Sequence, residues 1–132
     1  MFIRGAVSFC ALAAGSALAA DDYERFRLKD LNPGSRFEIA TSDRLFRGEL
    51  LDPKTGETRM TASWDGVMFT EPRTVFLLGA TQGRTPAAGG LMMVKMHEVQ
   101  SGLGMELGVG SMSEKDRIVT GPVHSIRIEQ EQ

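Results

Sequence analysis

Histidine and methionine are the side chains of this sequence whose types could support chemistry. The chain has 2 histidines, His97 and His124, and 8 methionines, one of which is the initiator. Imidazole and thioether groups are ligands that suit Cu(I). Met93 and His97 share one face of an alternating strand, but four residues apart they lie ~13 Å from each other. A copper site therefore needs a further ligand, such as Met105, from another strand.

Methionine also fills irregular hydrophobic cores, because its unbranched side chain adapts to gaps. We expect this structural role for the methionines of this chain. A soft-metal carrier that uses Met93, His97 and Met105 is the alternative.

The sequence offers no convergent set of catalytic residues. His124 and Ser125 are neighbours, and adjacent residues of a strand point to opposite faces, so they cannot form a base–nucleophile pair within one strand. The parity that His124 shares with Ile126 and Ile128 predicts a partly buried side chain. No G-x-S-x-G motif is present, and the only cysteine is Cys10. We therefore predict a protein that is not an enzyme, with a small hydrolase as the least favoured reading.

A glycine-rich stretch near the C-terminal end alternates with apolar residues over 101–110. A dinucleotide-binding pattern would need glycine at position 107, which is Leu107, so we read the stretch as a strand. One face of this strand is nearly bare, which predicts sharp curvature or a partner backbone packed flat against it. Together with a polar loop at 81–90, expected to be mobile, it forms the predicted partner surface: Gln82, Arg84, Gly102, Gly104, Gly108 and Gly110.

The elements that would position these residues are clearest over 36–66, which reads as a three-stranded meander. Phe37 and Ile39 alternate with polar residues, and Gly48 inside the second strand predicts a bend or a close backbone approach. The segment 52–56 has turn chemistry, because Pro53 presets its own φ and Gly56 can adopt a positive φ. Met60, Ala62 and Trp64 alternate in the third strand, which predicts that Trp64 lies in the core.

The meander with a glycine-bent second strand resembles the start of small SH3-like barrels, and 37–50 resembles the opening strand pair of Sm-like domains. The predicted fold is therefore all-β: an SH3-like barrel or roll of about six to eight antiparallel strands. Further along, 74–78 is continuously apolar and predicts the most buried strand, and 91–99 predicts one unbroken strand. Residues 21–31 fit either a short N-terminal helix or a strand, and both alternatives stay open.

The beginning of the chain has the features of a secretory signal. Arg4 is followed by an apolar run at 6–14 and by Ala17-Leu18-Ala19, which predicts a signal peptide over residues 1–20 and a single domain over 21–132. The run is too short to span a bilayer. Cys10 would be removed with the signal, and a cysteine-free exported domain fits a bacterial envelope.

The charge argues against two classes of partner. The chain carries 15 basic and 17 acidic residues, for a net charge of −2, and the predicted signal holds one of the basic residues and none of the acidic ones. A protein that binds nucleic acids or anionic lipids needs a positively charged surface, and this composition does not supply one. The sequence thus predicts a periplasmic or secreted binding or assembly module with a protein partner, no cofactor, and no membrane span after signal cleavage.

Overall fold

The computed structural model describes residues 21–85 and 90–129, so the predicted signal peptide lies outside the described part. The described residues form strands and two short 3₁₀ turns, and none of them forms an α-helix. The elements are β1 (Asp21–Tyr23), β2 (Arg25–Arg27), η1 (Leu28–Asp30), β3 (Arg36–Thr41), β4 (Leu45–Asp52), β5 (Glu57–Ser63), β6 (Arg73–Thr85), β7 (Gly90–Met96), β8 (Glu98–Gln100), β9 (Gly104–Val109), η2 (Glu114–Asp116), β10 (Arg117–Val119) and β11 (Val123–Glu129).

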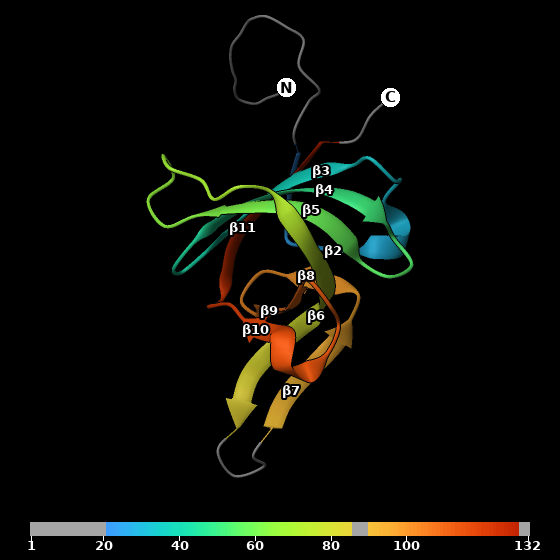
Figure 1. Ribbon diagram of the computed structural model, residues 1–132, viewed down its shortest axis with the longest axis vertical. Coiled ribbons are helices and arrows are strands. Elements are labelled where there is room, and N and C mark those ends of the chain that lie inside the picture. Colours follow the sequence, from blue (N-terminus) through green and yellow to red (C-terminus); the bar gives the residue numbers. More distant parts are fainter. Residues whose placement is uncertain (1–20, 86–89, 130–132) are drawn as a thin grey trace, which may run out of the picture.

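The all-β prediction is confirmed, with antiparallel pairing throughout. Nine strands form one sheet in the order β1-β11-β3-β4-β5-β6-β9-β10, with β7 also paired to β6, and β2 pairs with β8 in a separate ribbon. Figure 1 shows β3, β4 and β5 in the upper part and β6 descending to the β6–β7 hairpin. The described ranges hold more than the six to eight strands expected, because β1, β2, β8 and β10 are additional pieces of three residues each.

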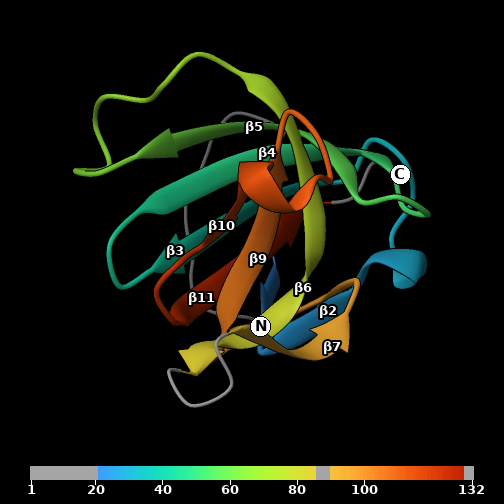
Figure 2. The same ribbon diagram turned by 60° about the horizontal axis from the view of Figure 1, so that its bottom comes forward.

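Of the two forms expected, an SH3-like barrel or roll, the closed barrel is not formed. Within the described residues, β1 and β10 end the strand order and do not pair with each other. The chain leaves β10 after three residues and crosses through Thr120, Gly121 and Pro122 to β11, which pairs with β1 and β3 instead. The sheet therefore stays open beside β10, as the turned view in Figure 2 shows.

The core lies on the inner side of the bent sheet. Phe37 and Ile39 are buried as the alternation of β3 predicts, and Phe46 of β4 is buried with them. The space at Gly48 is taken by side chains and not by the backbone approach predicted for it, because a Cβ there would collide with the ring of Phe37 and the methyl group of Thr58. Leu77, in the middle of the apolar 74–78 stretch, is 2% exposed, since β6 has β5 and β9 on its two sides.

The predicted unbroken strand over 91–99 is interrupted at His97. This residue has a φ of 53°, a left-handed conformation that is uncommon for a side chain other than glycine. Its N–H donates to the Leu78 carbonyl at 2.9 Å, and its carbonyl accepts from the Leu28 N–H at 3.0 Å. The corner at His97 separates β7, which pairs with β6, from β8, which pairs with β2.

The structure also decides two local predictions, one for residues 21–31 and one for residues 81–90. Residues 21–31 contain the strands β1 and β2 and the 3₁₀ turn η1, so the strand reading holds for much of it. The predicted loop at 81–90 is wrong at its ends, because β6 continues to Thr85 and β7 begins at Gly90. Pairing to a neighbouring strand outweighs the glycine-rich composition there. The described residues contain no helix long and apolar enough to cross a membrane.

Candidate functional site

The connection between β5 and β6 presents a cluster of exposed apolar side chains. It projects from the body of the molecule, at the left of Figures 1 and 2. Trp64, Val67 and Met68 are 73%, 77% and 75% exposed. The prediction that Trp64 lies in the core is wrong because β5 ends at Ser63, so the alternation that buries Met60 does not extend to Trp64. We call residues 64–69 the apolar loop.

The carboxylate of Asp65 fixes the conformation of the apolar loop. Its Oδ1 atom accepts hydrogen bonds from the backbone N–H groups of Val67 and Met68, at 2.8 and 3.0 Å, and from the Ser63 hydroxyl at 3.0 Å. The bonds from Met68 and Val67, followed by the one from Ser63, lower the pKa of Asp65 below its ordinary value of 3.8. Gly66 supports the turn with a φ of +79°. The exposed side chains are therefore held on an ordered backbone.

Arg44 lies beside this loop, between two aromatic rings. Its guanidinium carbon is 4.9 Å from the ring centre of Trp64 and 5.2 Å from that of Phe46. Its Nη2 atom is 3.7 Å from the carboxylate of Asp43, but its Nε atom is buried and has no hydrogen-bond partner among the described residues. A stacked guanidinium with an unused donor is well suited to bind an acceptor from outside the chain.

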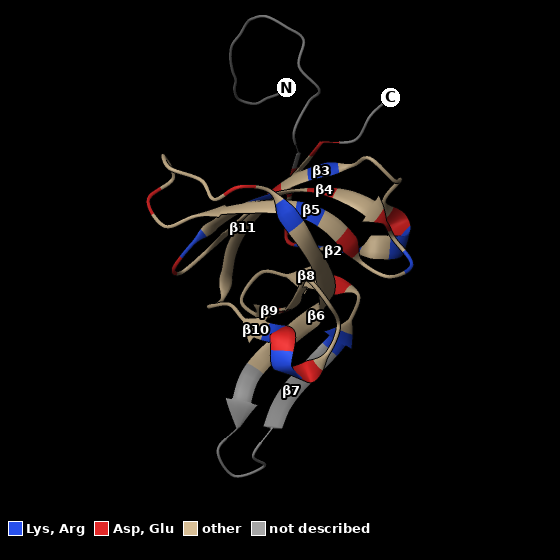
Figure 3. Cartoon of the chain, viewed as in Figure 1, with Lys and Arg blue, Asp and Glu red and all other residues tan. Residues whose placement is uncertain are grey.

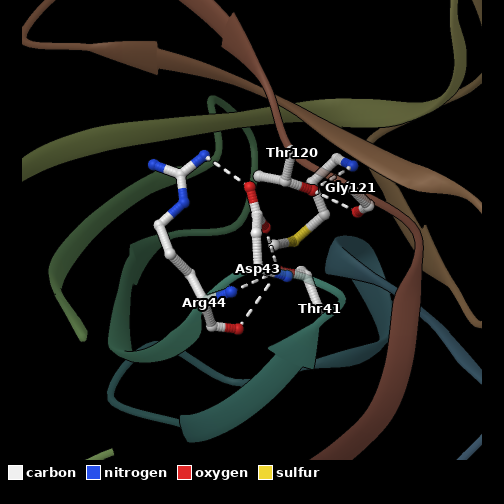
Figure 4. Close-up of polar contacts among 6 residues, drawn as sticks. Thr41, Asp43, Arg44, Thr120 and Gly121 are labelled. Atoms are coloured by element: carbon white, nitrogen blue, oxygen red, sulfur yellow. Dashed lines mark hydrogen bonds and ion pairs between the residues drawn. The ribbon is translucent and has the colours of Figure 1, made fainter. Parts of the chain in front are cut away.

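The turn over residues 41–44 holds Arg44 in this place. The hydroxyl of Thr41 donates to Asp43 at 2.7 Å and accepts from the Arg44 N–H at 3.1 Å (Figure 4). The turn is anchored to the β10–β11 connection, because the Ser42 N–H donates to the Pro122 carbonyl at 3.0 Å. Figure 4 shows Arg44 and Asp43 close to Thr120 in that connection. Arg44 thus lies next to the open side of the sheet.

A groove of about 510 Å³ runs between these elements. The regular pairing of β5 with β6 ends at Met60 and Arg73. Beyond it, the connection stays bound to β5 through the Thr70 N–H, which donates to the Ala62 carbonyl at 2.9 Å. No described strand closes the sheet beside β10, which leaves the groove open there. Its floor is apolar and consists largely of core side chains: Phe46, Met60, Val75, Leu107 and Ile118. Its rim is polar and aromatic: Arg44, Trp64, Thr70, Glu71 and Arg73.

This arrangement suits recognition. A volume of this size is typical of ligand sites that combine an apolar lining with a few polar groups. The floor can bury an apolar side chain, and Arg44 and Arg73 at the rim can bind a carboxylate. Within the described residues, no group of three or more histidine, cysteine, aspartate or glutamate side chains could hold a metal ion.

The candidate copper ligands lie in different environments. Met105 is fully buried in the core, and His97 is half-buried at the corner between β7 and β8. The side chain of Met93 is outside the part of the chain that the structure describes. The strand face that Met93 and His97 were predicted to share does not extend to His97, because β7 ends at Met96 and His97 has a left-handed φ of 53°.

Two of the six residues of the predicted partner surface are covered by the chain itself. Gly104 and Gly108 are buried, and a Cβ at either position would collide with the backbone carbonyl of Thr120 or Ser111, respectively. The bare face therefore packs on the β9–β10 connection at Ser111 and on the β10–β11 connection at Thr120, and it is not free for a partner. Gly102 and Gly110 are exposed and have φ values of +91° and +83°. Gln82 is exposed on β6, and the side chain of Arg84 lies outside the described part.

The second histidine is also placed differently from the prediction. His124 is exposed, whereas Ile126 and Ile128 are buried. The pairing of β11 with β3 shifts register between Val123 and Ser125, which inserts an extra residue and turns His124 outward. A β-bulge of this kind reverses the parity on which the prediction depended.

Sequence reasoning missed the groove and the apolar loop. The available signal was the run Trp64-Asp65-Gly66-Val67-Met68, in which an Asp-Gly turn is flanked on both sides by large apolar residues. Such a turn places those residues at a loop tip and not on the inner face of a strand. Arg44 carried no signal of its own, since its role depends on Trp64 twenty positions later.

The chain was also compared with known proteins. No family model, curated protein or solved structure matches it.

Proposed function

We propose that the protein is an exported, non-catalytic binding module of the bacterial envelope, and that its groove holds a polypeptide segment of a partner protein. The segment carries an apolar side chain for the floor and a carboxylate for Arg44. The observation that carries this proposal is the position of Arg44, stacked on Trp64 at the mouth of an apolar groove with its Nε unpaired among the described residues.

The chemistry of the rim favours a protein as the partner. Tryptophan, methionine and arginine are enriched in protein–protein interfaces, and they carry much of the binding energy there. Trp64 belongs both to the groove and to the apolar loop, so one partner can contact the two together. Because the loop is already ordered by Asp65, binding costs little conformational entropy.

A membrane surface is the competing occupant of the apolar loop. Tryptophan and other apolar side chains can insert into the interfacial region of a bilayer. Asp65 and Glu71, however, place exposed carboxylates on the same connection, where Figure 3 shows acidic positions in red. Together with the net charge of −2, these groups oppose binding to anionic lipid.

The experiment uses the single tryptophan of the chain as its reporter. Peptides are selected from a random display library on the purified protein, synthesised, and titrated while the emission of Trp64 is recorded. We expect selected peptides to share an apolar residue next to Asp or Glu and to shift the emission to shorter wavelength. Trp64→Ala should weaken binding at least ~10-fold, whereas Leu51→Ala, at another exposed apolar residue, should not.

A second pair of measurements isolates the role of Arg44. Arg44→Met keeps a long side chain but removes the charge, so it should weaken the acidic peptides and leave their Asp→Asn or Glu→Gln versions unaffected. Selected peptides that lack a carboxylate, or binding unchanged by Trp64→Ala, would contradict the proposal. An emission shift with phosphatidylglycerol vesicles and none with peptides would establish the membrane reading instead.

A further inference from the structure

A second polar surface lies on the ribbon formed by β2 and β8. The register pairs Phe26 with Val99, and both are buried, at 6% and 2% exposed. The residues on either side point away from the core because side chains alternate along a strand. The outer face of the ribbon therefore carries two cross-strand pairs: Arg25 with Gln100 and Arg27 with Glu98.

Two acceptors on this outer face are buried without a hydrogen bond. Oε2 of Glu98 and Oε1 of Gln100 are both covered from solvent, and neither receives a hydrogen bond within the described ranges. Glu98 is only 8% exposed, and its Oε2 lies 3.5 Å from Nζ of Lys95, an ion pair without hydrogen-bond geometry. Buried acceptors are nearly always satisfied in folded proteins, so two on one strand face call for donors from outside the chain.

Glu98 and Gln100 each line a hollow in the surface. Glu98 lines one of about 280 Å³, together with Arg27, Asp30 and Lys95. Gln100 lines one of about 460 Å³, together with Glu24 and Ser101. Arg25 lines both, so the two hollows adjoin each other along the ribbon.

The cations of this face are only partly neutralised. Arg27 is paired with Asp30 at 3.2 Å, and Lys95 is paired with Glu98. Arg25 is exposed and forms no ion pair with any residue that the structure describes. It is therefore a free donor between two buried acceptors.

These groups define the chemical class of the ligand. A simple anion would satisfy Arg25 but would give no donor to Glu98 or Gln100. A cation would be repelled by Arg25, whereas Lys95 is already paired with Glu98. A neutral molecule with neighbouring hydroxyl groups donates and accepts at once, because each hydroxyl has one donor and two acceptor positions.

We propose that the outer face of the β2–β8 ribbon is a binding site for a neutral saccharide. Glu98 and Gln100 accept hydrogen bonds from its hydroxyl groups, and Arg25 donates to them. The left-handed corner at His97 positions the site, because it directs β8 away from β6 and onto β2. The site is separate from the groove, since the residues lining the two sites do not overlap.

The test titrates the purified protein with maltohexaose, cellohexaose and chitohexaose, by calorimetry and by amide chemical shifts. At least one oligosaccharide should bind and shift the amides of residues 24–27 and 98–101. Gln100→Ala and Arg25→Ala should each weaken that binding ~10-fold or more. Glu98→Gln keeps the shape but replaces one acceptor by a donor, and it should weaken binding as well.

The controls separate this site from the groove and from misfolding. Arg59→Ala, at an exposed arginine of β5, and Trp64→Ala should leave saccharide affinity unchanged. Gln100→Ala should retain the wild-type melting temperature, because its Oε1 has no hydrogen bond from the described chain to lose. Binding of sulfate or of an end-blocked trialanine in place of every oligosaccharide would overturn the proposal. No binding at all, or binding unaffected by all three ribbon variants, would overturn it too.

Discussion

The guanidinium carbon of Arg44 lies 4.9 Å from the centre of the Trp64 ring, although the two residues belong to different connections of the sheet. The contact joins the turn before β4 to the loop after β5 across the mouth of the groove. Because Trp64 remains 73% exposed, the pair contributes little to the core and is available for binding.

This placement predicts different stabilities for two large apolar residues. Leu77→Ala should lower the free energy of unfolding by ~2–5 kcal/mol, the usual range for truncation of a buried leucine. Trp64→Ala should lower it by less than ~1 kcal/mol, because an exposed cation–π contact contributes at most about that much. Chemical denaturation of both variants measures the difference. Equal losses would mean that Trp64 is packed in the core.

The hydrogen bonds to Asp65 predict a pH dependence of the apolar loop. The folded pKa of Asp65 is lowered, so the carboxylate supports the loop above the ordinary value of 3.8, and this support is lost as the pH falls through the lower folded pKa. NMR titration should show the Asp65 carboxyl and the amides of Val67 and Met68 changing together below pH 3.8. Asp65→Asn should abolish the joint transition. A midpoint at or above 3.8 would contradict the assignment.

Two glycines with similar backbone angles predict different costs of substitution. Gly56 and Gly34 have φ values of +83° and +92°, so alanine is strained by ~1–2 kcal/mol at either position. A Cβ at Gly56 would also collide with the Leu77 carbonyl, whereas nothing lies within 4 Å at Gly34. Gly56→Ala should therefore destabilise the fold clearly more than Gly34→Ala, as thermal melts of the two variants can show.

The buried carboxylate of β9 predicts a coupled pair of variants. Glu106 is 1% exposed, and its Oε2 lies 3.4 Å from Nη1 of Arg117. Arg117→Ala should cost ~2–4 kcal/mol, because it leaves a buried charge without its partner. Adding Glu106→Gln should recover part of that loss. A double variant as unstable as the sum of the two single variants would show that the ion pair does not couple them.

The sequence by itself determined the all-β class and most of the strand positions. Alternation places Phe37 and Ile39 correctly, because side chains of a half-buried strand must point alternately to core and solvent. The Asp52–Gly56 turn could be predicted for a similar local reason. Proline restricts its own φ, and glycine can adopt a positive φ that other residues avoid. The glycine at 48 indicated a crowded position, but the structure fills the space with the side chains of Phe37 and Thr58 and not with another backbone.

The tertiary structure decided everything that depends on where a strand ends or shifts. The end of β5 at Ser63 exposes Trp64, the bulge at His124 reverses a parity, and the left-handed corner at His97 divides one apparent strand into β7 and β8. Each feature is set by pairing with segments distant in the sequence. The groove and the polar ribbon have the same origin, because Arg44 meets Trp64, and Arg25 meets Gln100, only after the chain has folded.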